Sequence, residues 1–302
     1  MKYIFVVNGR FDKAHILPDL EAQLAGRDIS YTTYVTKGIG DGTRYVRIHC
    51  EFHPGEEVCF VACGGSGTVN EVATGILGAG PEKSFAILAY GTTNDFTKCW
   101  PERCFTSLQD LLEGEEKQVD LIRCNDDFAL NVANIGFDAM VAYRANEFIE
   151  LGRSNPYGRS VLAGMLGSRF NRVKIWVDGE KISSCLTMLC TVANGRCCGG
   201  EFYCAPRARV DDGLIEVCLI RSLPLLLFLT ILPLYRSGRH LDSKRCMRHM
   251  VYRRAKKVVV ESPTMIFVSL DGEITAGTHL EFEILEGAVK LRLPRLREEV
   301  AQ

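Results

Sequence analysis

The chain has 302 residues, of which 47% are apolar and 24% charged, and its formal net charge is −1. This composition excludes a disordered protein, and the near-zero charge argues against a general nucleic acid-binding protein. The 13 cysteines lack the spacing of a disulfide framework, and Met1–Gly9 is too short an apolar run for a secretory signal, so we expect reduced thiols and a cytoplasmic protein.

Strand and helix patterns alternate from Tyr3 to about Leu121. The extended, apolar runs are Tyr3–Val7, Ile29–Thr36, Val58–Cys63, Phe85–Ala89 and Val119–Arg123. The helical patterns are His15–Leu24, Tyr45–Phe52, Val69–Ile76 (capped by Thr68) and Thr106–Leu112. This alternation predicts an α/β domain at 1–122 with a parallel sheet and helices on both faces. Its loops should meet at the carboxyl ends of the strands, where such sheets bind ligands.

The pattern changes near Arg123 to short extended runs. These are Phe128–Ile135, Arg172–Val177, Lys181–Ala193, Leu214–Ile220, Lys257–Val260, Met265–Leu270, His279–Ile284 and Val289–Leu293. The turn pairs Asp178-Gly179, Asp212-Gly213 and Asp271-Gly272 separate several of them, which favours antiparallel pairing. Helices are expected at Met140–Leu151, Val161–Arg169 and Leu223–Tyr235. We predict a mostly antiparallel second domain at 123–293, with a tail at about 294–302 that packs back on the first.

A glycine-rich turn joins the run Val58–Cys63 to the helix that follows. Such a turn presents backbone N–H groups and the positive end of a helix dipole, which favours phosphate. A Walker loop is excluded because no Lys follows Gly67, and the Rossmann fingerprint lacks its third glycine at Asn70. A hydrolase nucleophile at Ser66 is disfavoured because Thr68 occupies the second glycine position of that motif. A tight turn without a ligand remains the alternative.

Five stretches occur in one order that is typical of a known family. They are GGSGTVNEVATGI at Gly64–Ile76, GTTNDFTK at Gly91–Lys98, NVANIGFDAMV at Asn131–Val141, NGRCCGGEFYCAPRARVDDGLIEV at Asn194–Val217 and LDGE at Leu270–Glu273. On these motifs the chain resembles the bacterial diacylglycerol kinase and sphingosine kinase group of lipid kinases. The resemblance implies an NAD kinase-like first domain and a β-sandwich second domain. It also implies transfer of the γ-phosphate of ATP, with Mg²⁺, to the hydroxyl of a lipid such as diacylglycerol.

The resemblance also implies roles for individual residues. The nucleotide site would comprise Asn8, Thr36, Gly64, Gly65, Ser66, Gly67, Thr68, Asn70, Glu71, Thr92, Asn94 and Asp95. Glu273 would be the general base toward the lipid hydroxyl, with Asp271 beside it in the catalytic motif. The Asp212 carboxylate and the carbonyls of Arg209 and Leu214 would hold Mg²⁺. From the residues alone, helix capping by Thr92 and Asn94 and simple Asp-Gly turns remain alternatives.

The run Leu223–Tyr235 is apolar almost all round but too short to span a bilayer. Nine basic residues follow, with Asp242 the single acid among them: Arg236, Arg239, Lys244, Arg245, Arg248, Arg253, Arg254, Lys256 and Lys257. An apolar segment beside a basic cluster suits peripheral contact with an anionic membrane surface, here the inner face of the membrane. A core helix followed by a solvated basic face is the alternative. A homodimer formed through the second domain is also open.

Two departures from the family pattern fall on the nucleotide side. Ser66 stands where the family's glycine loop has Asp, and Asn8-Gly9-Arg10-Phe11-Asp12 stands where it has Asn-Pro-x-Ser-Gly. Serine cannot supply a negative charge to Mg²⁺ or accept a proton near neutral pH. The second hypothesis is therefore a catalytically impaired lipid kinase-like protein that binds nucleotide or lipid in a regulatory role. An NAD kinase and a serine hydrolase using Ser66 are the remaining alternatives.

Overall fold

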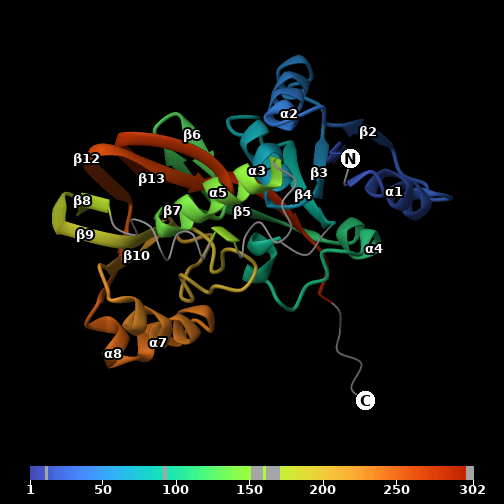
Figure 1. The fold of residues 1–302 in the computed structure, drawn as a ribbon. Coiled ribbons are helices and arrows are strands. Elements are labelled where there is room, and N and C mark those ends of the chain that lie inside the picture. Colours follow the sequence, from blue (N-terminus) through green and yellow to red (C-terminus); the bar gives the residue numbers. More distant parts are fainter. Residues whose placement is uncertain (11–12, 91–93, 151–158, 161–170, 297–302) are drawn as a thin grey trace. The chain divides into compact units, whose positions relative to one another are not determined.

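The computed structural model describes residues 1–302 except 11–12, 91–93, 151–158, 161–170 and 297–302 (Figure 1). The chain forms two compact units: unit 1 comprises Met1–Leu121 and Glu286–Gln302, and unit 2 comprises Ile122–Leu285. Strands β5 (Glu115–Cys124) and β13 (Glu273–Leu293) contribute residues to both units. The helix expected at Val161–Arg169 lies outside the described residues.

Unit 1 contains a sheet with the strand order β13-β4-β3-β1-β2. Its strands are β1 (Lys2–Val7), β2 (Tyr31–Val35), β3 (Val58–Gly64), β4 (Lys83–Ala89) and the end of β13. Neighbouring strands along this order pair in parallel, and Val7 is in register with both Val35 and Cys63. All residues of β3 are buried, as expected for an apolar central strand. The carboxyl ends of β1, β2 and β3 therefore lie at one edge of the sheet.

The helices of unit 1 are α1 (Ile16–Leu24), α2 (Asp41–Phe52), α3 (Ser66–Gly75) and α4 (Leu108–Leu112), with a 3₁₀ turn η2 (Asp95–Cys99). The predicted apolar face of α1 is buried at Ile16, Leu20 and Leu24. Helix α2 begins four residues before the predicted Tyr45. The helix starts earlier because a residue distant in sequence caps it. The Glu71 carboxylate of α3 accepts hydrogen bonds from the backbone N–H groups of Gly40 and Gly42, both at 2.8 Å.

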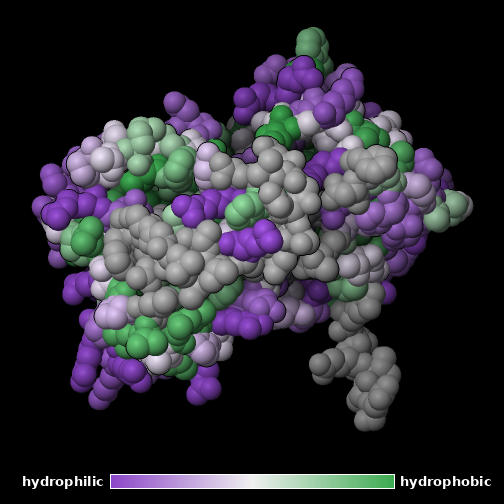
Figure 2. Space-filling model, viewed as in Figure 1, coloured by the Kyte–Doolittle hydropathy of each residue, from purple (hydrophilic) through white to green (hydrophobic). Residues whose placement is uncertain are grey.

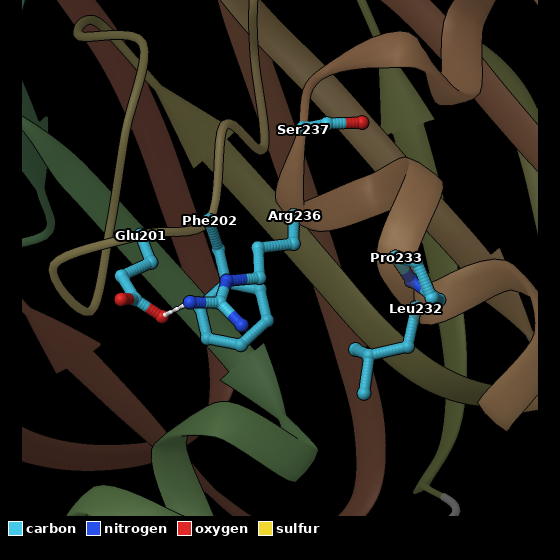
Figure 3. Close-up of a pocket in the computed structure, with 6 residues that line it drawn as sticks. All are labelled: Glu201, Phe202, Leu232, Pro233, Arg236 and Ser237. Carbon is cyan, nitrogen blue, oxygen red and sulfur yellow. Dashed lines mark ion pairs between the residues drawn. The ribbon is translucent and has the colours of Figure 1, made fainter.

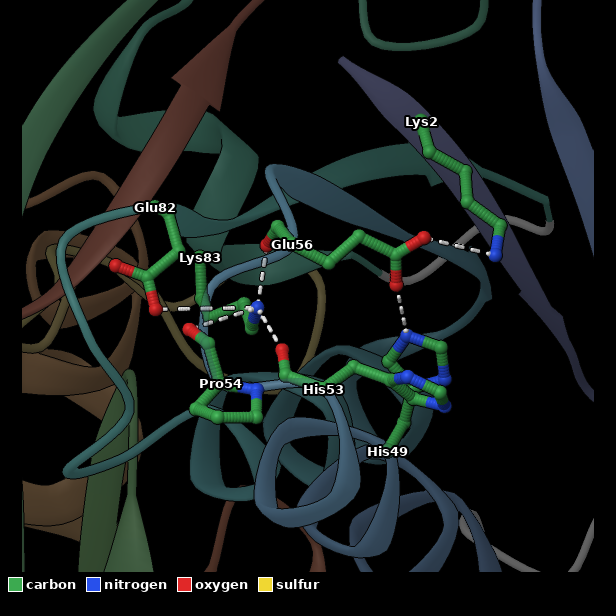
Figure 4. Close-up of polar contacts among 7 residues, drawn as sticks. All are labelled: Lys2, His49, His53, Pro54, Glu56, Glu82 and Lys83. Carbon is green, nitrogen blue, oxygen red and sulfur yellow. Dashed lines mark hydrogen bonds and ion pairs between the residues drawn. The ribbon is translucent and has the colours of Figure 1, made fainter.

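A buried lysine holds the carboxyl end of α2. Lys83 Nζ, at the start of β4, donates to the carbonyl oxygens of His53 at 2.7 Å and Pro54 at 3.5 Å, and to that of Glu56 (Figure 4). The Glu56 carboxylate in turn lies 2.9 Å from His49 Nε2 and 3.1 Å from Lys2 Nζ. A cation at a helix C-terminus also interacts favourably with the helix dipole. These contacts join the sheet to the end of α2.

Unit 2 is built mainly from antiparallel strands in the order β11-β10-β9-β7-β12-β13, with β8 paired to both β9 and β12. Its strands are β6 (Asp127–Ala129), β7 (Val132–Gly136), β8 (Asn171–Val177), β9 (Glu180–Ala193), β10 (Ile215–Arg221), β11 (Met250–Ala255) and β12 (Lys257–Leu270). Its helical segments are α5 (Phe137–Glu150), α7 (Leu225–Arg236), η3 (Arg239–Asp242) and α8 (Lys244–Met247).

Three strands of unit 2 differ from expectation. Strand β12 contains two predicted segments in one strand because its pairing with β13 shifts between Glu261 and Ile266, as at a β-bulge. Strand β13 likewise joins two predicted segments and runs on into unit 1, so residues 286–293 lie outside the unit to which we assigned them. Strand β11 was not predicted, because its sequence MVYRRA carries too little apolar alternation.

Candidate active site

Loops at the carboxyl ends of β1, β2 and β3 are tied together by side chains predicted to contact a nucleotide. Asn8 Nδ2 donates to Thr68 Oγ1 at 3.0 Å, and the Gly9 N–H donates to Thr36 Oγ1 at 3.1 Å. A Cβ at Gly9 would lie 1.9 Å from the Thr36 carbonyl oxygen, so only glycine allows this approach. The structure thus brings Asn8, Thr36 and Thr68 together at one edge of the sheet.

Helix α3 begins at Ser66, three residues before the predicted Val69, and Gly65 is its N-cap. The side chain of Thr68, expected to cap the helix, accepts from Asn8 Nδ2, and the N-cap residue Gly65 has no side chain with which to cap α3. A Cβ at Gly64 would lie 2.5 Å from Thr68 Oγ1, which explains the glycine there. The first turn of α3 therefore offers backbone N–H groups and the positive end of the helix dipole, as phosphate sites do.

The segment after β4 contributes a buried amide. Asn94 is 7% exposed, and neither its Oδ1 nor its Nδ2 has a hydrogen-bond partner among the described residues. A buried amide without partners costs about 1–3 kcal/mol, so such a group points to a ligand. The Asp95 carboxylate accepts from Lys98 Nζ at 2.7 Å. Thr92 lies outside the described residues.

Other predicted nucleotide contacts fare differently. Both carboxylate oxygens of Glu71 accept backbone N–H groups at the N-terminus of α2, and its contact with a nucleotide stays a prediction. Asn70 is half-buried on α3, one turn after its start. Two exposed cations that we did not predict follow the same strand ends, Arg10 after β1 and Lys37 directly after Thr36. A triphosphate site needs positive charge, and this need was the signal that could have identified them.

The LDGE motif forms the turn between β12 and β13. Asp271 and Gly272 have positive φ angles of 50° and 101°, so the predicted hairpin turn is confirmed. The Asp271 carboxylate accepts backbone N–H groups from Leu130 at 2.7 Å, Asn131 at 3.1 Å and Val132 at 2.8 Å. A carboxylate held by three amides fixes the turn, and the predicted catalytic role of Asp271 stays a prediction. Glu273 is exposed at the first position of β13.

The loop expected to hold Mg²⁺ pairs its carboxylate with an arginine. Arg254 Nη2 donates to Asp212 Oδ2, and the Leu214 N–H donates to Asp212 Oδ1 at 3.2 Å. Arg254 Nε also lies 3.0 Å from Oε1 of Glu216, whose pKa is raised mainly by burial. No group of three or more His, Cys, Asp or Glu side chains within the described residues could hold a metal ion. This arrangement does not fit a cation held by Arg209, Asp212 and Leu214.

Comparison with known proteins agrees with this organisation. Residues 2–124 match the diacylglycerol kinase catalytic domain, and residues 131–293 match the YegS C-terminal NAD kinase beta sandwich-like domain. The chain is 30% identical over 280 residues to the probable lipid kinase YegS-like of Pseudomonas aeruginosa, covering 89% of this chain and 86% of the relative. It is 25% identical over 296 residues to the diacylglycerol kinase of Bacillus subtilis, covering 95% and 93%.

Solved structures share the fold. A diacylglycerol kinase from Bacillus anthracis superposes with a TM-score of 0.66 at 22% identity, covering 100% of this chain and 98% of that one. An NAD kinase from Archaeoglobus fulgidus in complex with ATP gives a TM-score of 0.50 at 14% identity, covering 99% and 94%. The predicted NAD kinase-like fold with a β-rich second domain is confirmed.

The fold and the matched domains define a kinase-type phosphotransferase. The chain belongs to the YegS-like lipid kinase family, with an N-terminal diacylglycerol kinase catalytic domain, and the predicted family resemblance is thereby confirmed. None of the helices in the described part of the chain is long and apolar enough to cross a membrane.

Proposed function

We propose that this protein transfers the γ-phosphate of ATP to the hydroxyl group of a lipid such as diacylglycerol. Family membership supports the lipid kinase class, and the names of the relatives support diacylglycerol as the first acceptor to test. The observation that supports the nucleotide site is the N-terminus of α3, which has glycine as its N-cap. The bond from Asn8 to Thr68 and the bond from the Gly9 N–H to Thr36 join it to the ends of β1 and β2. These features suit a triphosphate.

Each part of unit 1 has a role in binding ATP. The N–H groups at the start of α3 bind phosphate oxygens, and the Asn94 amide supplies donors and an acceptor to the nucleotide. Arg10 and Lys37 contribute positive charge beside the strand ends. Mg²⁺ bound to the phosphates of ATP would offset part of their negative charge. Ser66 leaves the glycine loop without a carboxylate.

Glu273 of unit 2 is the general base of the proposed reaction. Its carboxylate accepts the proton of the lipid hydroxyl while that oxygen forms a bond to the γ-phosphorus. The bond between the γ-phosphorus and the β,γ-bridging oxygen breaks, and ADP leaves with that oxygen. Asp271 holds the turn in which Glu273 begins β13, so that the base is presented in a defined orientation.

The test is phosphoryl transfer from labelled ATP to diacylglycerol in mixed micelles, with Glu273→Gln beside the natural chain. We expect Glu273→Gln to lose at least 100-fold in kcat, which is typical of general-base removal, with nearly unchanged ATP binding. Glu261→Gln is the matched control, because Glu261 is also an exposed β-strand glutamate of unit 2. Equal turnover of the natural chain and Glu273→Gln would refute the assignment of the base. Transfer to NAD but to no lipid would refute the lipid kinase proposal.

A further inference from the structure

The outer face of helix α7 carries no charge over its first nine residues. Leu226 is 79% exposed and Leu229 is 42% exposed, and Thr230 and Pro233 are exposed along the same face. The opposite face, which includes Phe228, Ile231 and Tyr235, is buried in unit 2. A surface helix of a water-soluble domain normally turns charged side chains outward. The exposed leucines therefore indicate a surface that meets something other than water.

Exposed cations follow this face in the chain. Arg236 ends α7, and the following segments expose four more basic side chains: Arg239, Lys244, Arg245 and Arg248. Arg245 Nη2 lies 3.4 Å from Thr230 Oγ1, which places one of them directly beside the outer face. Figure 2 shows hydrophobic surface over α7 with hydrophilic side chains next to it.

Two acidic side chains near the end of α7, Glu201 and Asp242, each form an ion pair with an arginine. Glu201 forms an ion pair with Arg236, and Asp242 lies 3.2 Å from Arg207. The remaining cations give the face a positive charge, although the whole chain has a net charge of −1. Such a local excess complements an anionic surface.

A cavity of about 460 Å³ adjoins the same helix (Figure 3). Its lining residues are Glu201, Phe202, Leu232, Pro233, Arg236 and Ser237. Pro233 belongs both to the cavity and to the outer face, so the apolar surface continues from the leucines into the cavity. The ion pair between Arg236 and Glu201 lies at this end of α7.

We infer that the outer face of α7, with its flanking cations, docks unit 2 on an anionic lipid bilayer. Leu226 and Leu229 enter the interfacial layer, while Arg239, Lys244, Arg245 and Arg248 contact acidic headgroups. A bilayer suits this surface better than a protein groove, because apolar insertion and diffuse positive charge occur together without a specific polar partner. The docking role rests on the proposed function, since an enzyme that phosphorylates a bilayer lipid must reach that bilayer.

The test is cosedimentation of the full chain with vesicles of phosphatidylcholine alone or with 40% phosphatidylglycerol. We expect at least tenfold tighter binding to the anionic vesicles, because each cation near such a surface strengthens binding about fivefold. Leu226→Gln/Leu229→Gln should weaken binding at least tenfold, and Arg239→Gln/Arg245→Gln should remove most of the preference for anionic lipid. Met265→Gln and Lys174→Gln are the controls, because both residues are exposed on strands of unit 2 remote in sequence from α7.

Kinase assays separate this inference from the proposed function. The leucine variant should keep turnover of a monomeric short-chain diacylglycerol and lose turnover of long-chain diacylglycerol in vesicles. If the natural chain binds anionic vesicles but phosphorylates neither lipid, the docking surface stands and the proposed function fails. Vesicle binding that is equal in the natural chain and in the leucine variant would overturn the docking surface. If the leucine variant loses a dimer that the natural chain forms on sedimentation, but still binds vesicles, the outer face of α7 is instead a contact with a second copy of the chain.

Discussion

The substitution Asp271→Asn tests how the LDGE turn is held. The wild-type carboxylate accepts three backbone N–H groups, at 2.7 Å from Leu130, 3.1 Å from Asn131 and 2.8 Å from Val132. An asparagine offers one acceptor oxygen, and its NH₂ group would face donors. Hydrogen bonds to a charged group contribute about 1.5–3 kcal/mol each but do not add fully, so we expect a loss of about 3 kcal/mol.

That loss corresponds to a fall in Tm of roughly 6–12 °C for a unit of this size, measured by circular dichroism. Because Glu273 follows two residues later, kcat should fall more than tenfold while the KM for ATP stays nearly constant. The matched control is Asp178→Asn. Asp178 also precedes glycine in a hairpin turn with positive φ, and its Oδ1 accepts the N–H groups of Lys256 and Lys257 at 3.0 and 2.9 Å.

Because one oxygen of Asp178 accepts both N–H groups, Asp178→Asn keeps an acceptor for them and should lower Tm less than Asp271→Asn, without lowering kcat. If the two variants lower kcat equally, Asp271 does not position the base. If Asp271→Asn leaves Tm unchanged, the three amide contacts do not stabilise the fold as argued.

Three further predictions concern unit 1. Lys83→Met should lower the free energy of unfolding by about 2–3 kcal/mol in guanidinium titrations, because three carbonyl oxygens lose a buried cationic donor; an unchanged midpoint would contradict this. The pKa of Asp41 is lowered to about 2 by hydrogen bonds from Arg44, the Lys37 backbone and Tyr34, so its stabilising effect should be present above pH 4 and be lost as pH falls toward 2. At neutral pH the free energy of unfolding of the wild type should exceed that of Asp41→Asn by about 1 kcal/mol, because solvent screens the exposed Arg44. Acid titrations should show this difference disappearing between pH 4 and pH 2. Ser66→Asp should raise Tm by about 1–3 °C through the helix dipole and, in EDTA, weaken ATP binding measured by calorimetry, because the carboxylate competes with phosphate; tighter binding in EDTA would argue against phosphate at α3.

Local patterns predicted the elements whose determinants are local. The buried strands β1, β3 and β4 and the face of α1 follow from apolar runs and helical spacing within each segment. The start of α2 does not, because its N-terminal N–H groups are satisfied by Glu71, which lies about 30 residues later. No local pattern of residues 41–52 contains that information.

In the candidate site, too, local features were predicted and contacts with distant residues were not. The glycine turn and Asn94 were identified from motifs, and Asn8 and Thr36 from the family resemblance. The structure adds the bonds from Asn8 to Thr68 and from the Gly9 N–H to Thr36. The propensity of Asp271-Gly272 predicted a hairpin turn correctly. That propensity could not show that the Asp271 carboxylate would accept hydrogen bonds from backbone N–H groups about 140 residues earlier in the chain. Likewise, the Asp212 loop matched a metal motif, and its arginine partner comes from a strand that was not predicted.

The return of β13 to the sheet of unit 1 has a consequence for synthesis on the ribosome. Strand β4 is complete once Ala89 has emerged, but its parallel partner in β13 includes Leu291 and Arg292. At about 5–20 residues per second, the roughly 200 residues between them take on the order of 10–40 seconds to translate. During that interval one edge of β4 is open to pairing with another nascent chain. Translation speed through unit 2 should therefore influence the yield of soluble protein, even though every residue of the nucleotide loops has already been made.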